Sequence, residues 1–182
     1  MATIFSRIVA GEIPCYKIAE TADYLAFLDV RPQAKGHTLC IPKREIDYIF
    51  DMDDALLAGL TVFAKKVAKA VEKVVPCKRI GIAVIGLEVP HAHVHLIPLN
   101  TLSDLSFGKE PVLMAPEEMS ALAAKIADAW PGSDSAAFWY TVRPGLNDQL
   151  SSLVFSLAHF LRDAGASGLW RQLVADRGRL EP

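Results

Sequence analysis

The chain has 182 residues with 19 basic and 21 acidic side chains, so its net charge at neutral pH is −2. This length suits one domain with an added segment, or two small domains. Apolar residues make up 52% and charged residues 22%, which is close to the globular average and argues against a disordered chain. The near-zero net charge argues against a protein held on nucleic acid by phosphate neutralisation. No apolar run approaches the roughly 20 residues of a membrane-spanning helix.

The N-terminal residues and the cysteines indicate the cellular compartment of the protein. The opening residues, MATIFSR, lack the basic start and long apolar stretch of a signal peptide. Cys15, Cys40 and Cys77 are isolated and form no CxxC pair. We therefore expect a soluble, reduced, cytoplasmic protein that is not attached to a membrane.

Five short apolar segments of the first 130 residues are typical of strands. They follow an opening apolar turn, and they cover residues 15–20, 24–29, 37–41, 79–85 and 91–97. In the third segment, strict alternation puts His37, Leu39 and Ile41 on one face of the strand and Cys40 on the other.

Two helices are predicted between and after these strands. Aspartates at positions 51, 53 and 54 can cap a long helix that ends before Pro76. Its apolar residues recur every three or four positions and form one stripe: Leu57, Leu60, Ala64, Val67, Val71 and Val74. Pro116 and Glu117 open a second helix, which runs to about Trp130.

Residues 131–182 differ in composition from the rest and contain no lysine. Residues 147–164 carry leucine and phenylalanine on one helical face, with Gly165 placed to end the helix, and a second short helix follows Ser167. The sequence therefore predicts a domain of residues 1–130 and a C-terminal helical hairpin in residues 131–182. The fold class is α+β: an antiparallel meander of about five strands, a long helix packed on it, and this hairpin.

The histidines carry the strongest functional signal. His91, His93 and His95 alternate with Ala92, Val94 and Leu96 in one strand-like segment. This spacing points the three imidazoles to one face of the strand and the apolar side chains into the core.

Three interpretations of this cluster compete. Imidazoles on one strand can bind Zn²⁺ or Fe²⁺, although supporting ligands are few, with Glu88 alone nearby. One imidazole can instead attack phosphorus while its neighbours stabilise charge and protonate the leaving group. The third interpretation is a polar strand face without chemistry.

The segment HAHVHLI at residues 91–97 resembles the signature of the histidine triad superfamily, in which three histidines alternate with apolar residues. Three earlier blocks match the family in order and spacing: IFSRIVAGEIP at 4–14, AFLDVRPQA at 26–34 and GHTLCIPK at 36–43. The resemblance covers about residues 3–130 and does not extend to the tail.

The resemblance implies nucleotide chemistry at the α-phosphate and a role for each matching residue. His93 would be the nucleophile that forms a nucleotidyl-imidazole intermediate. His91 and His95 would contact phosphate oxygens or the leaving group, and His37 would fix the hydrogen bonding of the triad. Asp29 would receive the ribose hydroxyls.

The base of the nucleotide would be sandwiched by Phe5, Ile8 and Leu39, and the resemblance further implies a homodimer with joined sheets. No cofactor is expected, since a divalent metal is not obligatory in this scheme. Nucleic acid is not expected as a partner.

One segment departs from the family pattern. Hydrolase members carry Gly-Gln and then Ser or Thr before the first histidine, and a polar amide near position 80. Here Gly86 is kept, but Leu87 and Glu88 replace the polar pair and Ile80 replaces the amide. Glu88 could act as a replacement acid, bind an amine-bearing leaving group, or be a solvated loop charge.

The sequence therefore favours a hydrolase that cleaves nucleoside phosphoramidates of purine nucleotides at the α-phosphate. A dinucleoside polyphosphate hydrolase would use the same residues with another leaving group. The altered loop at Leu87 and Glu88 also suggests a nucleotide-binding regulatory module with weak or lost catalysis. A metal-dependent enzyme is the weakest alternative.

Overall fold

The computed structural model describes residues 2–130; residue 1 and residues 131–182 lie outside the described residues. The predicted hairpin in residues 131–182, and the division of the chain at residue 130, therefore stay predictions.

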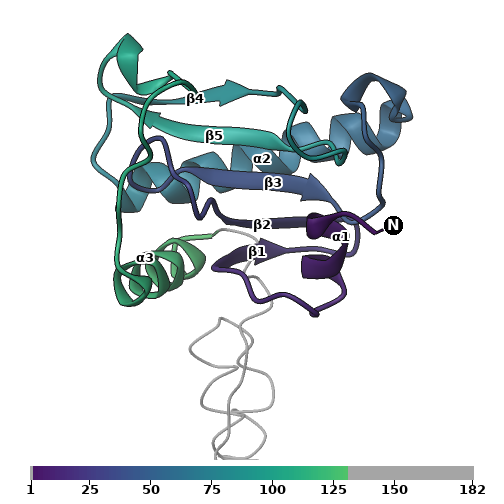
Figure 1. Cartoon of the computed structure of the whole chain (residues 1–182), viewed down its shortest axis with the longest axis horizontal. Helices are drawn as coiled ribbons and strands as arrows, with labels where there is room; N and C mark the ends of the chain where they lie inside the picture. Colours follow the sequence, from purple (N-terminus) through teal and green to yellow (C-terminus); the bar gives the residue numbers. More distant parts are fainter. Residues whose placement is uncertain (1, 131–182) are drawn as a thin grey trace, which may run out of the picture. The chain divides into compact units, whose positions relative to one another are not determined.

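The centre of the fold is a five-stranded antiparallel sheet, as predicted (Figure 1). Its strands are β1 (Lys17–Glu20), β2 (Tyr24–Leu28), β3 (Thr38–Pro42), β4 (Arg79–Ala83) and β5 (Val94–Leu99). Their order across the sheet is β1-β2-β3-β5-β4, so the expectation of a simple meander is wrong at one place. The chain leaves β3 through a long helix, reaches the sheet edge as β4, and returns as β5 between β3 and β4.

That long helix is α2 (Asp54–Val74), and Figure 1 shows it behind the sheet. It begins where the sequence predicts, because the Asp53 side chain accepts a hydrogen bond from the backbone N–H of Leu56 at 2.8 Å. The middle of the predicted stripe is buried against the sheet. Helix α3 (Pro116–Asp128) starts at the predicted proline and joins the same core.

The two faces of the sheet have separate apolar cores. Ala26, Leu28, Cys40, Val94 and Leu96 pack with α2 and α3. On the opposite face a smaller cluster contains Phe5 from helix α1 (Ile4–Val9), where the sequence suggested only an apolar turn, together with Leu25, Phe27, Leu39 and Ile41. The predicted alternation along β3 is therefore confirmed, and the face away from α2 is the one that carries His95.

Short 3-10 turns follow β3 and β5: η1 (Ile49–Asp51) and η2 (Leu102–Asp104). None of the helices within residues 2–130 combines the length and hydropathy that crossing a bilayer requires.

Candidate active site

The structure brings the predicted histidines together on one face of the sheet. His95 lies in β5 opposite Leu39 of β3, while His91 and His93 lie in the extended segment just before β5, which begins three residues later than predicted. His37 lies directly before β3 and is 1% exposed. All four imidazoles are buried side chains.

Gly36 fixes where His37 enters the sheet. Its φ of +85° lies in the left-handed region, which favours glycine. A Cβ atom there would also lie 2.7 Å from Cγ2 of Val75, closer than real contacts allow. A larger residue at this position would strain the backbone next to His37 and displace the Val75 side chain.

The proton of His93 is placed by a main-chain group. Nδ1 of His93 lies 2.7 Å from the carbonyl oxygen of His91, and a carbonyl only accepts hydrogen bonds. The N–H of the neutral ring is therefore at Nδ1, and the lone pair is at Nε2. Within residues 2–130 no protein atom hydrogen-bonds Nε2 of His93, so the lone pair is available to a ligand.

The proton of His95 is placed by a chain of two bonds. The backbone N–H of Gln33 donates to Nδ1 of His37 at 3.1 Å, so the neutral His37 ring carries its proton on Nε2. That Nε2–H donates to Nδ1 of His95 at 3.0 Å. The neutral His95 ring then carries its own proton on Nε2, which has no protein partner among the described residues. With ring centroids 4.8 Å apart, His93 and His95 present a lone pair and an N–H donor side by side.

Burial keeps this histidine pair neutral. It lowers the pKa of His37 to about 4, with a smaller contribution from the charge of His93. Burial also lowers the pKa of His95 to about 3, helped by His37 and His93 and opposed by Asp29. The hydrogen-bond chain through both rings therefore holds at neutral pH.

The same pKa shifts make stability depend on pH. An unfolded histidine has a pKa of about 6.5, so between pH 6.5 and about 4 the unfolded chain binds protons that the folded chain excludes. The contribution of these two histidines to the free energy of unfolding is complete above pH 6.5. On acidification below that pH, the free energy of unfolding should fall by up to about 1.4 kcal/mol per pH unit for each histidine. Urea denaturation between pH 7.5 and 4.5 measures this, and His37→Gln should reduce the slope; an unchanged slope in that variant would contradict the assignment.

Asp29 lies beside His37 with its side chain 18% exposed. Its Oδ2 is 3.5 Å from Nδ1 of His37, but the two do not form an ion pair at neutral pH because His37 is uncharged. The other carboxylate oxygen accepts the backbone N–H of Arg31 at 2.8 Å. Asp29 therefore keeps an oxygen open to a hydroxyl donor.

Asp29, His37 and His95 are also the one group within residues 2–130 whose ligand atoms lie close enough, within 4.8 Å, to share a metal ion. Both nitrogens of His37 and Nδ1 of His95 are already hydrogen-bonded, whereas Nε2 of His95 has no partner among the described residues. A metal bound to His37 would have to displace either the Gln33 N–H or the hydrogen bond to His95.

The three residues predicted to hold the base lie together next to the histidines. Phe5 and Leu39 are buried in the smaller core, and Ile8 packs against it. The Phe5 ring stands edge-on to His93 with centroids 5.2 Å apart. Phe5, Ile8 and Leu39 therefore form an apolar wall beside the histidines.

Both nitrogens of His91 are occupied by protein groups. Nε2–H donates to the carbonyl oxygen of Pro42 at 2.8 Å, and Nδ1 accepts from the Thr3 hydroxyl at 3.0 Å. His91 is completely buried. This geometry leaves His91 no free atom for a phosphate, and it favours a positioning role over the predicted phosphate contact.

A further aromatic side chain contacts the histidines. The ring of Phe107, which sequence reasoning missed, stands edge-on to His95 with centroids 5.0 Å apart, and it also contacts His37. Only its aromatic character could have indicated a role at the site, since Phe107 comes from a segment with no strand or helix pattern.

Leu87 and Glu88 are both exposed on the loop before His91, with Leu87 89% exposed.

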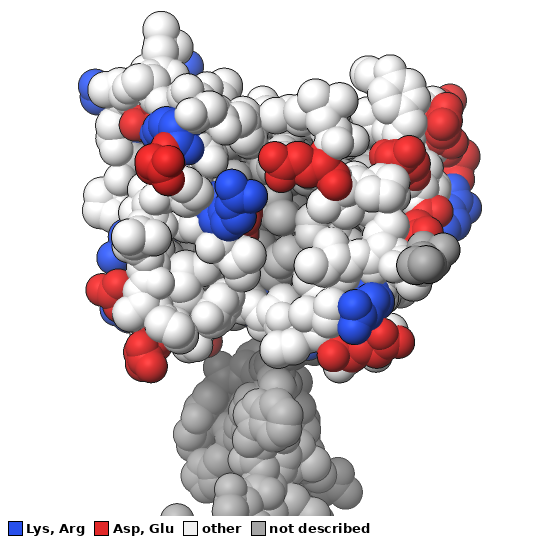
Figure 2. Space-filling model, in the orientation of Figure 1, with Lys and Arg blue, Asp and Glu red and all other residues white. Residues whose placement is uncertain are grey.

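The charges on this side of the molecule are mixed. Figure 2 shows the face away from α2 with small groups of both signs around a hollow near its middle, and with uncharged side chains over most of its area. The view contains no broad basic patch of the kind that nucleic-acid binding needs.

The sequence and the fold are similar to those of known proteins. The HIT domain model matches residues 10–102. An adenosine 5′-monophosphoramidase of Schizosaccharomyces pombe is 39% identical over 130 residues, which are 70% of this chain and 97% of that protein. An adenosine 5′-monophosphoramidase of Saccharomyces cerevisiae is 39% identical over 98 residues, 53% of this chain and 62% of that protein. The crystal structure of a HIT-like protein of Bartonella henselae superposes with a TM-score of 0.61 at 31% identity, covering 70% of this chain and 95% of that one. The chain therefore belongs to the HIT domain family.

Proposed function

We propose that this HIT protein is a nucleotide phosphoramidase that cleaves at the α-phosphate of purine nucleoside phosphoramidates. The observation that carries the proposal is the lone pair on His93 Nε2 beside the N–H on His95 Nε2, each fixed by its own hydrogen-bond partner. The two yeast relatives that are adenosine 5′-monophosphoramidases support the substrate class.

The reaction runs in two displacements at phosphorus. Nε2 of His93 attacks the α-phosphorus, a P–N bond forms to the imidazole, and the bond to the leaving amine breaks while the amine takes up a proton. Water then attacks the same phosphorus, the bond to His93 breaks, and the monophosphate leaves. The proton released by water balances the one taken up by the amine.

Protein groups stabilise charge in both displacements. The nucleotidyl imidazole is positively charged, and its Nδ1–H stays on the His91 carbonyl, which accepts that proton at 2.7 Å. Nε2–H of His95 donates to a phosphoryl oxygen, where negative charge increases in the transition state. Fixed donors and acceptors do this without reorganising at the moment of reaction.

The nucleoside is held by the apolar wall and by Asp29. The purine lies against Phe5, Ile8 and Leu39, whose packing on the smaller core keeps the wall rigid. The free carboxylate oxygen of Asp29 accepts from the ribose hydroxyls. Glu88 is exposed near the first histidine of the triad, where it could contact an amine-bearing leaving group.

Replacing Asp29 by Asn tests the ribose contact. The variant should raise KM for ribonucleotide substrates by about 10- to 100-fold, because a hydrogen bond to a charged acceptor contributes about 1.5–3 kcal/mol. The 2′,3′-dideoxy form of each substrate is the matched control, and its KM should change by less than about threefold. Equal losses for both forms would show that Asp29 does not receive the ribose.

Turnover without metal is the direct test of the function. The purified full chain is treated with a chelator and given an adenosine phosphoramidate, a dinucleoside polyphosphate and the guanosine forms of both. We expect monophosphate release, fastest from the phosphoramidate. Preference for the polyphosphate would assign the second candidate leaving group, and activity lost in proportion to chelator would require a metal. Binding without turnover would favour a regulatory module, for which the exposed Leu87 and Glu88 are the structural reason.

We also propose a homodimer formed through β4. This strand lies at the sheet edge, and the chain there exposes Ile82 (59%), Val84 (39%) and Ile85 (42%). Light scattering should give about twice the chain mass of 19.8 kDa. Ile82→Glu should shift the mass toward the monomer. Leu102→Glu, which also places a charge on an exposed aliphatic residue but lies in η2, should leave the mass unchanged. A monomeric wild type would overturn this proposal.

A further inference from the structure

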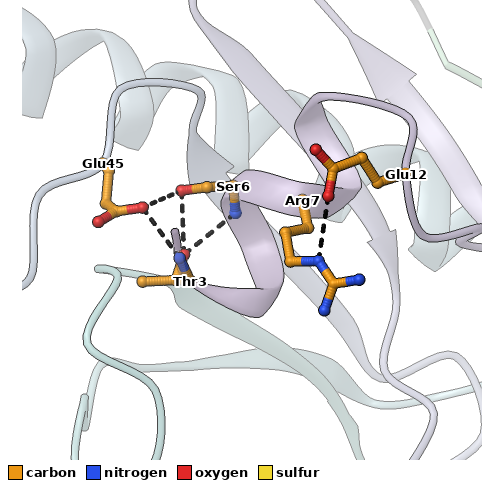
Figure 3. Close-up of polar contacts among 5 residues, drawn as sticks. All are labelled: Thr3, Ser6, Arg7, Glu12 and Glu45. Atoms are coloured by element: carbon orange, nitrogen blue, oxygen red, sulfur yellow. Dashed lines mark hydrogen bonds and ion pairs between the residues drawn. The ribbon is translucent and has the colours of Figure 1, made fainter. Parts of the chain in front are cut away.

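Figure 3 shows a polar group formed by two segments that are distant in the sequence. This group lies next to the first histidine of the triad. Thr3 and Ser6 belong to the start of α1, and Glu45 follows β3. The backbone N–H of Thr3 donates to Oε2 of Glu45 at 3.1 Å, and the Ser6 hydroxyl donates to the same oxygen. One carboxylate oxygen therefore holds two donors of the helix start.

The hydroxyl protons of this group have defined directions. An ionised carboxylate only accepts, so the Ser6 O–H points to Glu45. Hydrogen bonds from Ser6 and Thr3 lower the pKa of Glu45, which keeps it ionised. Thr3 Oγ1 accepts the backbone N–H of Ser6 at 3.1 Å, and two acceptors lie 3.0 Å from it, Ser6 Oγ and Nδ1 of His91. Because Nε2–H of His91 donates to Pro42 O, Nδ1 of the neutral ring is an acceptor and needs the Thr3 proton.

That remaining proton reaches His91. Thr3 Oγ1 lies 3.0 Å from Nδ1 of His91, and Ser6 Oγ lies 3.5 Å from the same atom. The opposite nitrogen donates to Pro42 O, three residues before Glu45 in the chain. The buried ring is therefore held on both sides, at Nε2 by the last residue of β3 and at Nδ1 by the start of α1, which Glu45 in turn holds.

His91 connects this group to the nucleophile through its main chain. Its carbonyl oxygen accepts the Nδ1–H of His93, and residues 91 and 93 lie outside any strand that could fix them. The neighbouring backbone makes two hydrogen bonds, from the His91 N–H to Val89 O at 2.8 Å and from the Ala92 N–H to Ile46 O at 2.7 Å. Neither bond is made by the His91 carbonyl itself, so the anchored His91 ring adds a side-chain restraint on the position of that carbonyl.

We propose that Thr3, Ser6 and Glu45 form a positioning network for His93. Glu45 orients the two hydroxyls, Thr3 holds the His91 ring, and the ring fixes the carbonyl that keeps the proton of His93 on Nδ1. This inference rests on the proposed function, in which His93 Nε2 attacks phosphorus. None of the three residues touches substrate in this scheme.

The test uses substitutions that remove one link at a time in the full chain. Thr3→Val keeps the shape of the side chain and removes the hydroxyl, and Thr3→Ser restores a hydroxyl. Glu45→Ala removes an exposed carboxylate, which the fold tolerates even if Thr3→Val does not fold. Glu12→Ala is the matched control, because Glu12 is also an exposed carboxylate paired to α1, through Arg7 at 3.1 Å, and its pair is separate from Thr3, Ser6 and Glu45 (Figure 3).

Two readouts separate the network from the reaction. By NMR, exchange of the His93 Nδ1 proton with solvent should be about tenfold faster or more in Thr3→Val and Glu45→Ala, and unchanged in Thr3→Ser and Glu12→Ala. With a phosphoramidate, kcat should fall about 10- to 100-fold in Thr3→Val and severalfold in Glu45→Ala, while KM stays within about twofold.

Each result has one meaning. Wild-type exchange of the His93 proton in both variants would overturn the network, and so would unchanged kcat in both. If the wild type turns over no substrate, the proposed function fails, and the exchange of the His93 proton alone still decides whether the network holds that ring.

Discussion

Replacing His93 by Asn is expected to reduce turnover by on the order of 10⁴-fold or more while nucleotide affinity stays within about tenfold, or ~1.4 kcal/mol. Asparagine can still donate an N–H to the His91 carbonyl, which accepts from His93 in the wild type at 2.7 Å. It has no lone pair comparable to that of Nε2, because the amide nitrogen is conjugated with its carbonyl. The substitution therefore removes the attacking atom and keeps the hydrogen bond.

The measurement pairs single-turnover kinetics with calorimetric binding of adenosine monophosphate, on wild type and variant side by side. Wild type quenched early should carry an acid-labile nucleotidyl group on His93, and the variant should carry none. Equal denaturation midpoints would show that the variant is folded. Residual activity above about 1% would mean that water or another side chain attacks phosphorus directly, and the two-displacement scheme would be wrong.

The parts of the fold that the sequence predicted are local. Asp53 caps α2 because a carboxylate at that position serves the first backbone N–H groups, and the stripe through Leu60 and Val67 faces the sheet because its period matches a helix. The alternation around Cys40 likewise divided β3 between two cores. The helix cap, the helix stripe and the strand alternation each depend on residues that are close together in the sequence.

The strand order could not be read in the same way. β5 pairs with both β3 and β4, and its pairing with β3 joins residues more than fifty positions apart, such as Leu39 and His95. Nothing in the segment 79–85 indicates that it lies at the edge, because an edge strand and a central strand differ in their neighbours and not in their period. The connection through helix α2 places β4 two strand positions away from β3, and β5 then pairs between them.

The grouping of the histidines on one face was predictable from the sequence, but their protonation was not. The spacing of His91, His93 and His95 indicated a common face, and the structure places them there. Their tautomers depend on the carbonyls of Pro42 and His91 and on one backbone N–H, groups that every residue has. A sequence pattern cannot show which main-chain atom meets a given ring. The resemblance implies that His91 contacts phosphate oxygens or the leaving group, whereas its two occupied nitrogens favour a positioning role.

The second large effect is expected at His95. Substitution by Ala should lower kcat by about 10²- to 10³-fold, the usual loss when a fixed donor to a transition-state oxygen is removed. The variant also leaves Nε2–H of His37 without the acceptor it now has at 3.0 Å. His95→Gln should recover most of the rate, to within about tenfold of wild type, because its amide can place an N–H donor in the same region.

This rescue distinguishes a hydrogen-bond donor from a proton donor. Burial disfavours the cation of His95, so in the free protein the ring offers an N–H that it keeps. A glutamine can replace that hydrogen bond, but it cannot transfer a proton to a departing amine. If His95 must transfer the proton, Gln will be as slow as Ala with an alkylamine leaving group, and both will be nearly normal with a nitrophenyl ester, whose leaving group needs no proton. If His95 acts as a donor to phosphoryl oxygen, Ala will be slow and Gln fast with both substrates, because the charge on that oxygen develops whichever group departs.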